Sequence, residues 1–543
     1  MRRGRRRSGV LLLLLGSVAA ATLAPAGAGA ADGPVHQAFR ARARASASAA
    51  RPVITPESGY VGPLLVLEPH LVGREAAEPT IAVTRGGLVF YAAAKFNDGL
   101  SPATPRTEIL VSGDQGETWF SVQQTAPDPA LSVPPTTLDP YVYVDPATDR
   151  VFSVDLYGGC SLLSYTDNSG ESWTNNPAAC DIPVNDHQTL AAGPPPAGTS
   201  TLGYPSVIYY CVNQVAGATC ARSLDGGDTF TNAGLPAFEG VGPNGEICSS
   251  LHGHVVVDDE GRVFLPRGCG DEVQLAVSED GGLTWSRSVA SNLPSAAYHT
   301  SVAVDDAGTV YYVWWDNKDR LPYLAVSRDH GATFGPALLV APPGVKETNF
   351  PTMDAGIAGQ VVISFPGTTW DDRDDNTRPW NFYVMTSTDA LSEAPLFVSS
   401  TSNAPSDPIH RGDCGPGRCA GMWDFLDIVL APTGDLWAAA VDTCTAVNEC
   451  NSPDGGQAAY PSAPGLAIRS ASGPGLRGTP VFRSVPVKPP APSVPGRPTT
   501  PARPTTPDRP LPSTGINAGI AWLAVAALVT AAALGRGRVA RTR

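Results

Sequence analysis

Five ionisable side chains recur at one position of a repeated pattern, immediately before a short apolar run. They are Glu78, Asp139, His187, His252 and His299, and the last two repeats have Phe350 and Phe425 there. Three of the eight histidines therefore share one position with two carboxylates. Imidazole and carboxylate groups can exchange protons, ligate a metal ion or bind a ligand. The structural alternative is that each side chain caps the strand that follows by hydrogen-bonding a neighbouring repeat.

A second group of polar residues follows the next apolar run of several repeats. Arg267, Asp271, Asp316 and Arg320 are the members that we add to the ligand-binding candidates. We expect both groups to converge on a ligand, because so many polar side chains fall at equivalent positions. No residue can be assigned a catalytic role from these patterns.

A densely acidic stretch lies between residues 370 and 376 and contains Asp371, Asp372, Asp374 and Asp375. Carboxylate oxygens are the ligands that calcium prefers, so calcium is the one cofactor to consider. The spacing matches no established calcium loop, and solvated loops are often acidic. The sequence names no other cofactor.

An eight-residue turn must position these groups, and its best copy is Ser278-Glu-Asp-Gly-Gly-Leu-Thr-Trp285. The Asp280 carboxylate can accept hydrogen bonds from backbone N–H groups two and three residues on and from the Thr284 hydroxyl. Gly282 allows a positive φ, and Trp285 buries a large ring between neighbouring strands. Copies begin at residues 112, 166, 223, 278 and 327, and worn copies begin at 387 and 470.

These turns resemble the Asp-box (BNR) repeat of sialidases and related β-propellers, over roughly residues 60 to 487. The resemblance implies an all-β propeller and says little about activity, because the family includes many non-enzymes. Apolar runs of four to six residues between turn residues also favour strands. We count seven blades, with six as the alternative. The inner strands are expected near 79–83, 140–144, 188–192, 253–257, 300–304, 351–355 and 426–430.

A propeller of this kind places its loops on two faces. The Asp-box turns lie on one face. The loops between second and third strands, and those that lead into each inner strand, lie on the other face, around the mouth of the central channel, where ligands usually bind. All ten cysteines fall on this predicted ligand face, in an exported chain where disulfides form. The natural pairs are Cys160–Cys180, Cys211–Cys220 and Cys248–Cys269, and the pairing of Cys414, Cys419, Cys444 and Cys450 stays open.

The sialidase resemblance is incomplete at the residues that carry activity. Sialidases bind the substrate carboxylate with three arginines, the first in a Phe/Tyr-Arg-Ile-Pro motif, and use a Tyr–Glu nucleophile pair. The corresponding stretch here, residues 74–81, reads Arg-Glu-Ala-Ala-Glu-Pro-Thr-Ile, which is not that motif. Other ligand-face loops contain Arg267, Arg320, Arg373, Arg378 and Arg411, none in a recognisable family context.

The ends of the chain predict export and anchoring. Residues 1–31 read as a signal peptide, with five arginines before a short apolar core, and 32–58 as a disordered lead-in. The propeller is assigned to 59–487 and a Pro/Thr-rich spacer to 488–510. Leu511-Pro512-Ser513-Thr514-Gly515 then resembles the LPXTG cell-wall sorting signal of Gram-positive bacteria, followed by an apolar span at 516–534 and four arginines up to 543.

The sorting resemblance implies that a sortase joins Thr514 to peptidoglycan, so that the apolar span crosses the membrane as a helix only before sorting. Without the five arginines of residues 1–30 and the four of residues 515–543, the chain has 28 basic and 51 acidic residues, a net charge of −23. Such a charge argues against nucleic acid as a partner. We therefore expect an extracellular, wall-anchored propeller that binds a glycan or a surface protein. The alternative is a sialidase-like glycoside hydrolase acting on extracellular glycans.

Overall fold

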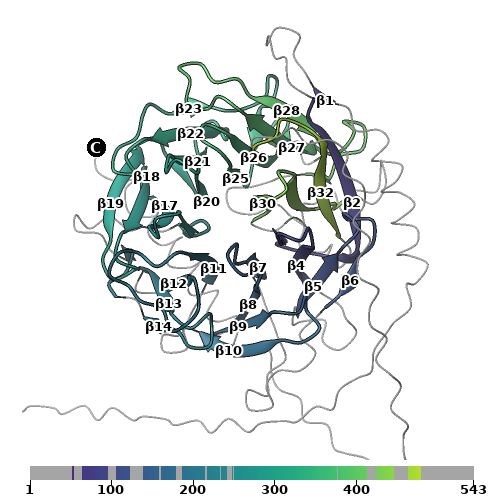
Figure 1. Cartoon of the computed structure of the whole chain (residues 1–543). Helices are drawn as coiled ribbons and strands as arrows, with labels where there is room; N and C mark the ends of the chain where they lie inside the picture. The colour runs from purple at the N-terminus through teal and green to yellow at the C-terminus, as the bar shows by residue number, and fades with distance from the viewer. Residues whose placement is uncertain are drawn as a thin grey trace, which may run out of the picture.

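The structure is a computed structural model of the whole chain (Figure 1). It describes residues 52–53, 64–95, 106–122, 139–157, 160–178, 186–214, 217–232, 234–240, 248, 250–375, 377–412, 422, 425–444 and 463–477. The predicted signal peptide, most of the lead-in, the spacer and the sorting signal with its helix lie outside these residues. In the part of the chain that is described, no helix is long and apolar enough to cross a membrane.

The described strands form seven antiparallel sheets arranged as the blades of a propeller (Figure 1). The inner strands are β3 (Thr80–Val83), β7 (Tyr141–Val144), β11 (Asp186–Gly193), β16 (Val256–Val257), β20 (Ser295–Val304), β25 (Thr352–Ala355) and β30 (Asp427–Leu430). The second strands are β4 (Val89–Lys95), β8 (Val151–Tyr157), β12 (Val207–Gln214), β17 (Val263–Cys269), β21 (Val310–Asp316), β26 (Val361–Thr368) and β31 (Leu436–Val441). The prediction of seven blades is confirmed, and each inner strand overlaps its predicted range.

The third strands are β5 (Arg106–Ser112), β9 (Cys160–Thr166), β13 (Gly217–Ser223), β18 (Glu272–Ser278), β22 (Pro322–Ser327), β27 (Pro379–Ser387) and β32 (Pro464–Ser472). The outer strands are β6 (Phe120–Ser121), β10 (Thr174–Ala178), β14 (Thr231–Asn232), β19 (Ser286–Ser291), β23 (Leu338–Leu339), β28 (Val398–Thr401) and β2 (Val66–Glu75). Four short strands add to these sheets: β1 (Pro52–Val53), β15 (Phe238–Glu239), β24 (Glu347–Thr348) and β29 (His410–Arg411).

The seventh blade departs from the predicted plan, in which every repeat builds its own outer strand. Its outer strand is β2, which comes from the N-terminal part of the propeller and pairs antiparallel with β32. The Glu68 carboxylate on β2 accepts hydrogen bonds from the Arg469 guanidinium on β32, the shorter at 2.8 Å. The two ends of the propeller domain therefore close the ring within one sheet, as Figure 1 shows for β2 and β32.

The recurring turns follow one hydrogen-bond plan. Asp280 Oδ1 accepts from the N–H groups of Leu283 and Thr284, which are three and four residues on rather than two and three as predicted. Asp280 Oδ2 accepts from the Thr284 hydroxyl at 2.6 Å, and Gly282 has the expected positive φ of 83°. Trp285 is only half-buried. The same Thr hydroxyl to Asp bond recurs at Asp114, Asp225 and Asp329.

Neighbouring blades are joined through the inner strands. Side-chain oxygens of one inner strand accept hydrogen bonds from the backbone N–H of the next, as in Val142 N to Thr80 Oγ1 at 2.9 Å. At the ring closure, Ile81 N donates to Asp427 Oδ2 at 3.1 Å. The second strands, such as Val310–Asp316, are buried along their whole length between adjacent sheets. The core therefore consists of layers between blades, around a channel lined by the inner strands.

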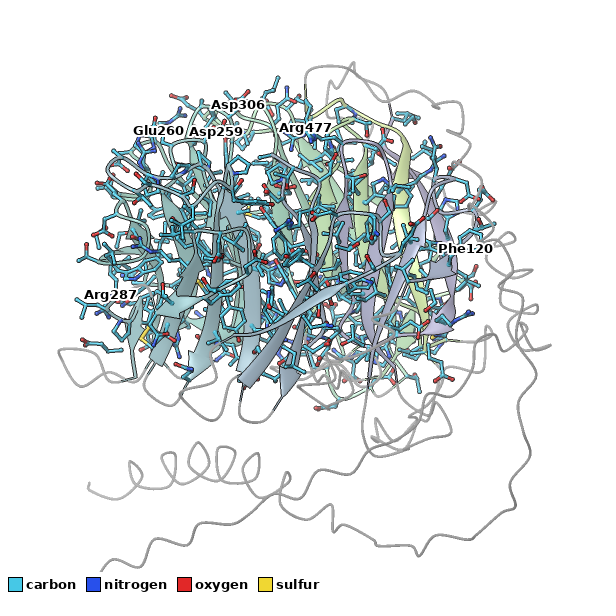
Figure 2. The ribbon with its side chains drawn as sticks, turned by 60° about the horizontal axis from the view of Figure 1, so that its bottom comes forward. Phe120, Asp259, Glu260, Arg287, Asp306 and Arg477 are labelled. Atoms are coloured by element: carbon cyan, nitrogen blue, oxygen red, sulfur yellow. A yellow bond between two sulfur atoms is a disulfide. The ribbon has the colours of Figure 1, made fainter. Side chains whose placement is uncertain are left out.

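The connections define two faces. The turns that join inner to second strands lie on the same side as the turns that join third to outer strands, and we call this side the turn face. Figure 2 shows Asp259, Glu260 and Asp306, which belong to inner hairpin turns, together on one side of the molecule. The opposite side, which carries the starts of the inner strands and the ends of the second strands, is the mouth face. All of the candidate ligand residues belong to the mouth face.

Candidate functional site

The residues predicted to precede the inner strands lie at or near the strand starts, with His187 inside β11 and His299 inside β20, and they are buried wherever their side chains are described. Glu78, Asp139, His187 and His252 are each less than 9% exposed. The backbone at Glu78, His187 and Phe350 has a positive φ of 45–50°. Non-glycine residues rarely adopt this conformation, and it persists where surrounding contacts impose it. The side chain of His299 lies outside the described part of the structure.

Asp139 makes the contact that the capping alternative predicts. Its Oδ2 accepts a hydrogen bond from the backbone N–H of His187 in the next blade at 3.1 Å. The Gln188 side chain donates to the Asp139 carbonyl oxygen. This carboxylate therefore joins two blades, and the joining contact explains its position without a ligand.

His187 and His252 belong to a group of rings that fills the mouth of the channel. The His187 ring lies 5.6 Å from His252, 5.9 Å from His254 and 5.2 Å from Phe425, measured between ring centroids. Tyr141 meets His254 edge to face at 5.0 Å. A hollow lined by His187, His254 and Phe425 among others has a volume of about 30 Å³, which is room for one or two water molecules.

Burial keeps two of these imidazoles neutral. It lowers the pKa of His252 to about 3 and that of His254 to about 4. A group with such a pKa is not a proton donor at neutral pH. With these two imidazoles neutral, the rings of His187, His252, His254 and Phe425 pack together at the channel mouth as a mostly aromatic plug.

Two buried carboxyl groups have pKa values shifted upward, and one of them, Asp427, lies 3.7 Å from His254 Nδ1 in this plug. Burial raises the pKa of Asp427 to about 7, against hydrogen bonds from the N–H groups of Ile81 and Ile428. Burial also raises the pKa of Asp155 to about 7, although the Thr107 hydroxyl donates to it. Asp155 lies in the second strand β8 and Asp427 begins the inner strand β30, and neither is among the ligand-binding candidates named from the sequence.

The other predicted candidates at the ends of second strands are dispersed. Asp271 is exposed at the tip of the β17–β18 hairpin. Asp316 Oδ1 accepts from the N–H groups of Lys318 and Asp319 and so shapes a turn. Arg267 is buried and donates to the carbonyl oxygens of Cys248 and Ser250. The structure therefore does not bring the four residues of this group together.

Arg320 belongs instead to a charged cluster that sequence reasoning missed. Glu347, on β24, is 1% exposed, and its carboxylate lies 2.5 Å from Arg320 Nη1 and 2.6 Å from Arg378 Nη1. Arg373 Nε is 3.8 Å away. We call these four residues the Glu347 cluster. Its arginines come from the loops of blades five and six on the mouth face, but the carboxylate that they surround is the protein's own.

The loop between β26 and β27 carries an exposed tryptophan beside this cluster. The Trp370 side chain is exposed, with the residue 43% exposed, and the Trp370 backbone N–H donates to Thr368 Oγ1. In the same loop, Arg373 is half-exposed and donates to the Asp319 carbonyl oxygen at 2.9 Å. Lys346 lies 3.3 Å from Asp371. The result is an apolar ring among charged groups that are held in place.

The acidic residues of this loop were the candidates for calcium. Asp372 Oδ1 accepts from Asp374 N, and Asp375 Oδ1 accepts from the Thr377 N–H and hydroxyl. Among the described residues, no group of three or more His, Cys, Asp or Glu side chains is arranged to hold a metal ion. Calcium binding stays a prediction.

Two of the predicted disulfides are present. Cys211–Cys220 joins directly opposed residues of β12 and β13, and Cys248–Cys269 ties the start of blade four to the end of β17. Cys444 is also disulfide-bonded. The predicted Cys160–Cys180 pair and the pairing of Cys414, Cys419 and Cys450 involve residues outside the described part. Both observed disulfides lie on the mouth face, where they link second strands to neighbouring segments.

No protein-family model and no curated protein matches the chain. Solved structures resemble it at low similarity, among them a protein of unknown function from Dyadobacter fermentans, with a TM-score of 0.40 and 13% identity over 76% of this chain and 100% of that one. The NanB sialidase from Streptococcus pneumoniae has a TM-score of 0.37 and 12% identity over 69% and 66%. The GH74 xyloglucanase from Xanthomonas campestris has a TM-score of 0.39 and 14% identity, over 70% of this chain and 53% of that one. Values this low carry no argument about activity, and the assignment of seven blades rests on the sheets of this chain.

Proposed function

We propose that the protein is a secreted propeller, joined to peptidoglycan through Thr514 by a sortase, whose mouth face binds an extracellular glycan or surface protein. The observation that carries the binding role is Trp370. An exposed tryptophan on a short loop with internal hydrogen bonds presents a rigid apolar surface at small entropic loss. Arginine and tryptophan are also the side chains that contribute most to binding at protein surfaces.

The charged groups around Trp370 support a ligand rich in hydroxyl groups. Arg373 and Lys346 supply donors, and Asp371 supplies acceptors. Because both signs of charge are present, the surface can hydrogen-bond a neutral sugar whose apolar face lies on the indole ring. Within the Glu347 cluster, the Glu347 carboxylate lies 3.8 Å from Arg373 Nε and helps to hold Arg373 in position.

The experiment is binding of the mature chain, residues 32–514, to a glycan array and to cells that display candidate surface proteins. We expect binding by the wild type and a loss of at least tenfold for Trp370→Ala. Phe120→Ala is the matched control, because Phe120 is also an exposed aromatic residue, at 61%, but lies on an outer strand (Figure 2). Equal binding by all three proteins would remove Trp370 as the contact.

A glycoside hydrolase is the second candidate, and Asp155 is the residue that favours it. A carboxyl group with a pKa of about 7 can donate a proton at neutral pH, as such an acid catalyst must. A sialidase-like site would use three arginines to bind the carboxylate of the substrate. The three arginines of the Glu347 cluster surround the protein's own Glu347 carboxylate instead. Incubation with a fluorogenic sialoside separates the two functions. Turnover that disappears in Asp155→Asn would replace binding by hydrolysis, and array binding without turnover supports the binding role.

A further inference from the structure

Arg267 is a buried cation for which the described residues provide no anionic partner. Its side chain, on β17, is 6% exposed. Nε donates to the Ser250 carbonyl oxygen at 2.8 Å and Nη2 to the Cys248 carbonyl oxygen at 2.7 Å. A guanidinium has five N–H groups, and Nη1 is buried without a hydrogen-bond partner. No carboxylate in the described part of the chain forms an ion pair with it.

Arg378 shows what compensation of such a charge looks like in this protein. It is fully buried as well, but its Nη1 lies 2.6 Å from Glu347 Oε2. An unpaired buried charge destabilises a fold strongly. Around Arg267 the only described compensation is the pair of carbonyl oxygens and the face of Phe238, whose ring centroid is 5.7 Å from Cζ. Burial lowers the pKa of Arg267 to about 10, so the group stays charged at neutral pH.

His252 lies beside Arg267 and has a second unpartnered atom. The two residues are directly opposed in an antiparallel bridge, which places both side chains on the same face. His252 Nδ1 is 2.7 Å from the Gly253 carbonyl oxygen, so Nδ1 carries the proton and donates. Nε2 is buried without a partner. Nε2 is an acceptor in this tautomer and offers an anion no hydrogen bond, so the charge to be neutralised is that of the Arg267 guanidinium alone.

We propose that Arg267, with His252 beside it, forms an internal site for one small monovalent anion, either chloride or the carboxylate of a small acid. The anion accepts from Nη1 and neutralises the guanidinium. The Cys248–Cys269 disulfide holds Cys248 in place, and Cys248 supplies one of the carbonyl oxygens that orient the guanidinium. This site is separate from Trp370 and does not depend on the proposed binding of a glycan.

The experiment is thermal unfolding of the mature chain as the concentration of chloride rises, with sodium gluconate keeping the ionic strength constant. Gluconate is too large for an enclosed site, so general screening of surface charges is the same throughout. An anion that binds only the folded state raises the unfolding midpoint in proportion to the logarithm of its concentration above the Kd. We expect this rise for chloride or for acetate, and the stronger of the two identifies the preferred anion.

Substitutions test whether the dependence of the unfolding midpoint on the anion arises at Arg267. Arg267→Gln should abolish the dependence on chloride and acetate. If that variant does not fold, Arg267→Lys, which keeps a charge but loses the planar fork, should weaken the apparent affinity about tenfold. Arg287→Gln is the matched control, because Arg287 lies 5.9 Å from the same Phe238 ring but pairs with Glu239.

His252→Gln places an amide donor where Nε2 has none and should tighten binding. A wild-type midpoint that is the same in chloride, acetate and gluconate would overturn the site, and so would an unchanged dependence in the Arg267 variants.

Discussion

Aspartate side chains lie on both faces of the propeller, in opposite surroundings. On the turn face, Asp329 is fully exposed, and hydrogen bonds from Thr333 and Ser327 lower its pKa to about 2. Near the mouth face, burial raises the pKa of Asp155 and of Asp427 to about 7. The turn face repeats one arrangement from blade to blade, whereas the mouth face has different residues at equivalent positions. The repeated turns stabilise each blade in the same way. The residues of the mouth face are not held to one pattern, so they can differ from blade to blade.

The largest effect should come from the Glu347 cluster, because the buried Glu347 carboxylate pairs there with the buried Arg378 guanidinium. Glu347→Gln leaves Arg378 buried without its carboxylate, and loss of one partner of a buried pair typically costs about 3–5 kcal/mol. Urea unfolding of the purified chain measures this loss. Lys346→Ala is the control on the neighbouring residue, since its exposed pair with Asp371 should contribute less than about 1 kcal/mol. Similar unfolding free energies for the two variants would mean that the cluster is not a unit of stability.

The next effect depends on pH. The pKa of Asp427 is raised in the folded state, so the stability associated with its protonation is complete below about pH 4 and is lost as the pH rises through about 7. The lowered pKa values of His252 and His254 act in the opposite direction, because the unfolded chain takes up their protons below about pH 6.5. Because the raised pKa of Asp155 acts in the same direction as that of Asp427, two carboxyl groups oppose two imidazoles, and the wild type should show a weak net dependence between pH 4 and 7.

Asp427→Asn separates these contributions. Relative to the wild type, the variant should gain stability as the pH rises from 4 to 8, on the order of 3 kcal/mol over that range. A constant loss from the changed hydrogen bonds to Ile81 and Ile428 adds to this at every pH. Chemical unfolding at four or five pH values measures the difference. If the two curves stay parallel, Asp427 is ionised in the folded protein throughout.

A smaller and uniform effect is expected on the turn face. Asp280→Ala removes an acceptor that serves two N–H groups and the Thr284 hydroxyl, all near solvent, and should cost about 1–2 kcal/mol. Asp225→Ala should give the same value within about 0.5 kcal/mol, and Asp329→Ala should also lower the stability, because the sites are far apart and alike. Unequal losses among the three variants would contradict the comparison of the two faces.

The two faces also differ in how far the sequence predicted them. The repeated turn predicted the blades, because the hydrogen bonds of Asp280 and its counterparts are local and fix the turn backbone independently of neighbouring blades. It did not predict β2 as the outer strand of blade seven, since that pairing joins residues at opposite ends of the domain. On the mouth face, aligned positions identified His187 and His252 but not that their rings fill the channel. Glu347 had no pattern at all, because its role depends on three arginines brought to it by two blades.

The smallest effect tests the one turn that has asparagine in place of aspartate. Asn168 Oδ1 accepts from Ser172 N at 3.0 Å, and its Nδ2 donates to the Ser172 hydroxyl at 2.9 Å. Asn168→Asp reverses the second bond, so that the hydroxyl donates to a carboxylate as it does in the other turns. A charged acceptor forms the stronger bond, and we expect a gain of about 0.5 kcal/mol at pH 7 that disappears below about pH 3, where the carboxylate is protonated. Thermal unfolding at both pH values measures it, with Asn292→Asp, at an exposed asparagine outside the turn, as the control. A loss of stability at pH 7 would show that this blade has adapted to asparagine and that the turn face is less uniform than its hydrogen bonds indicate.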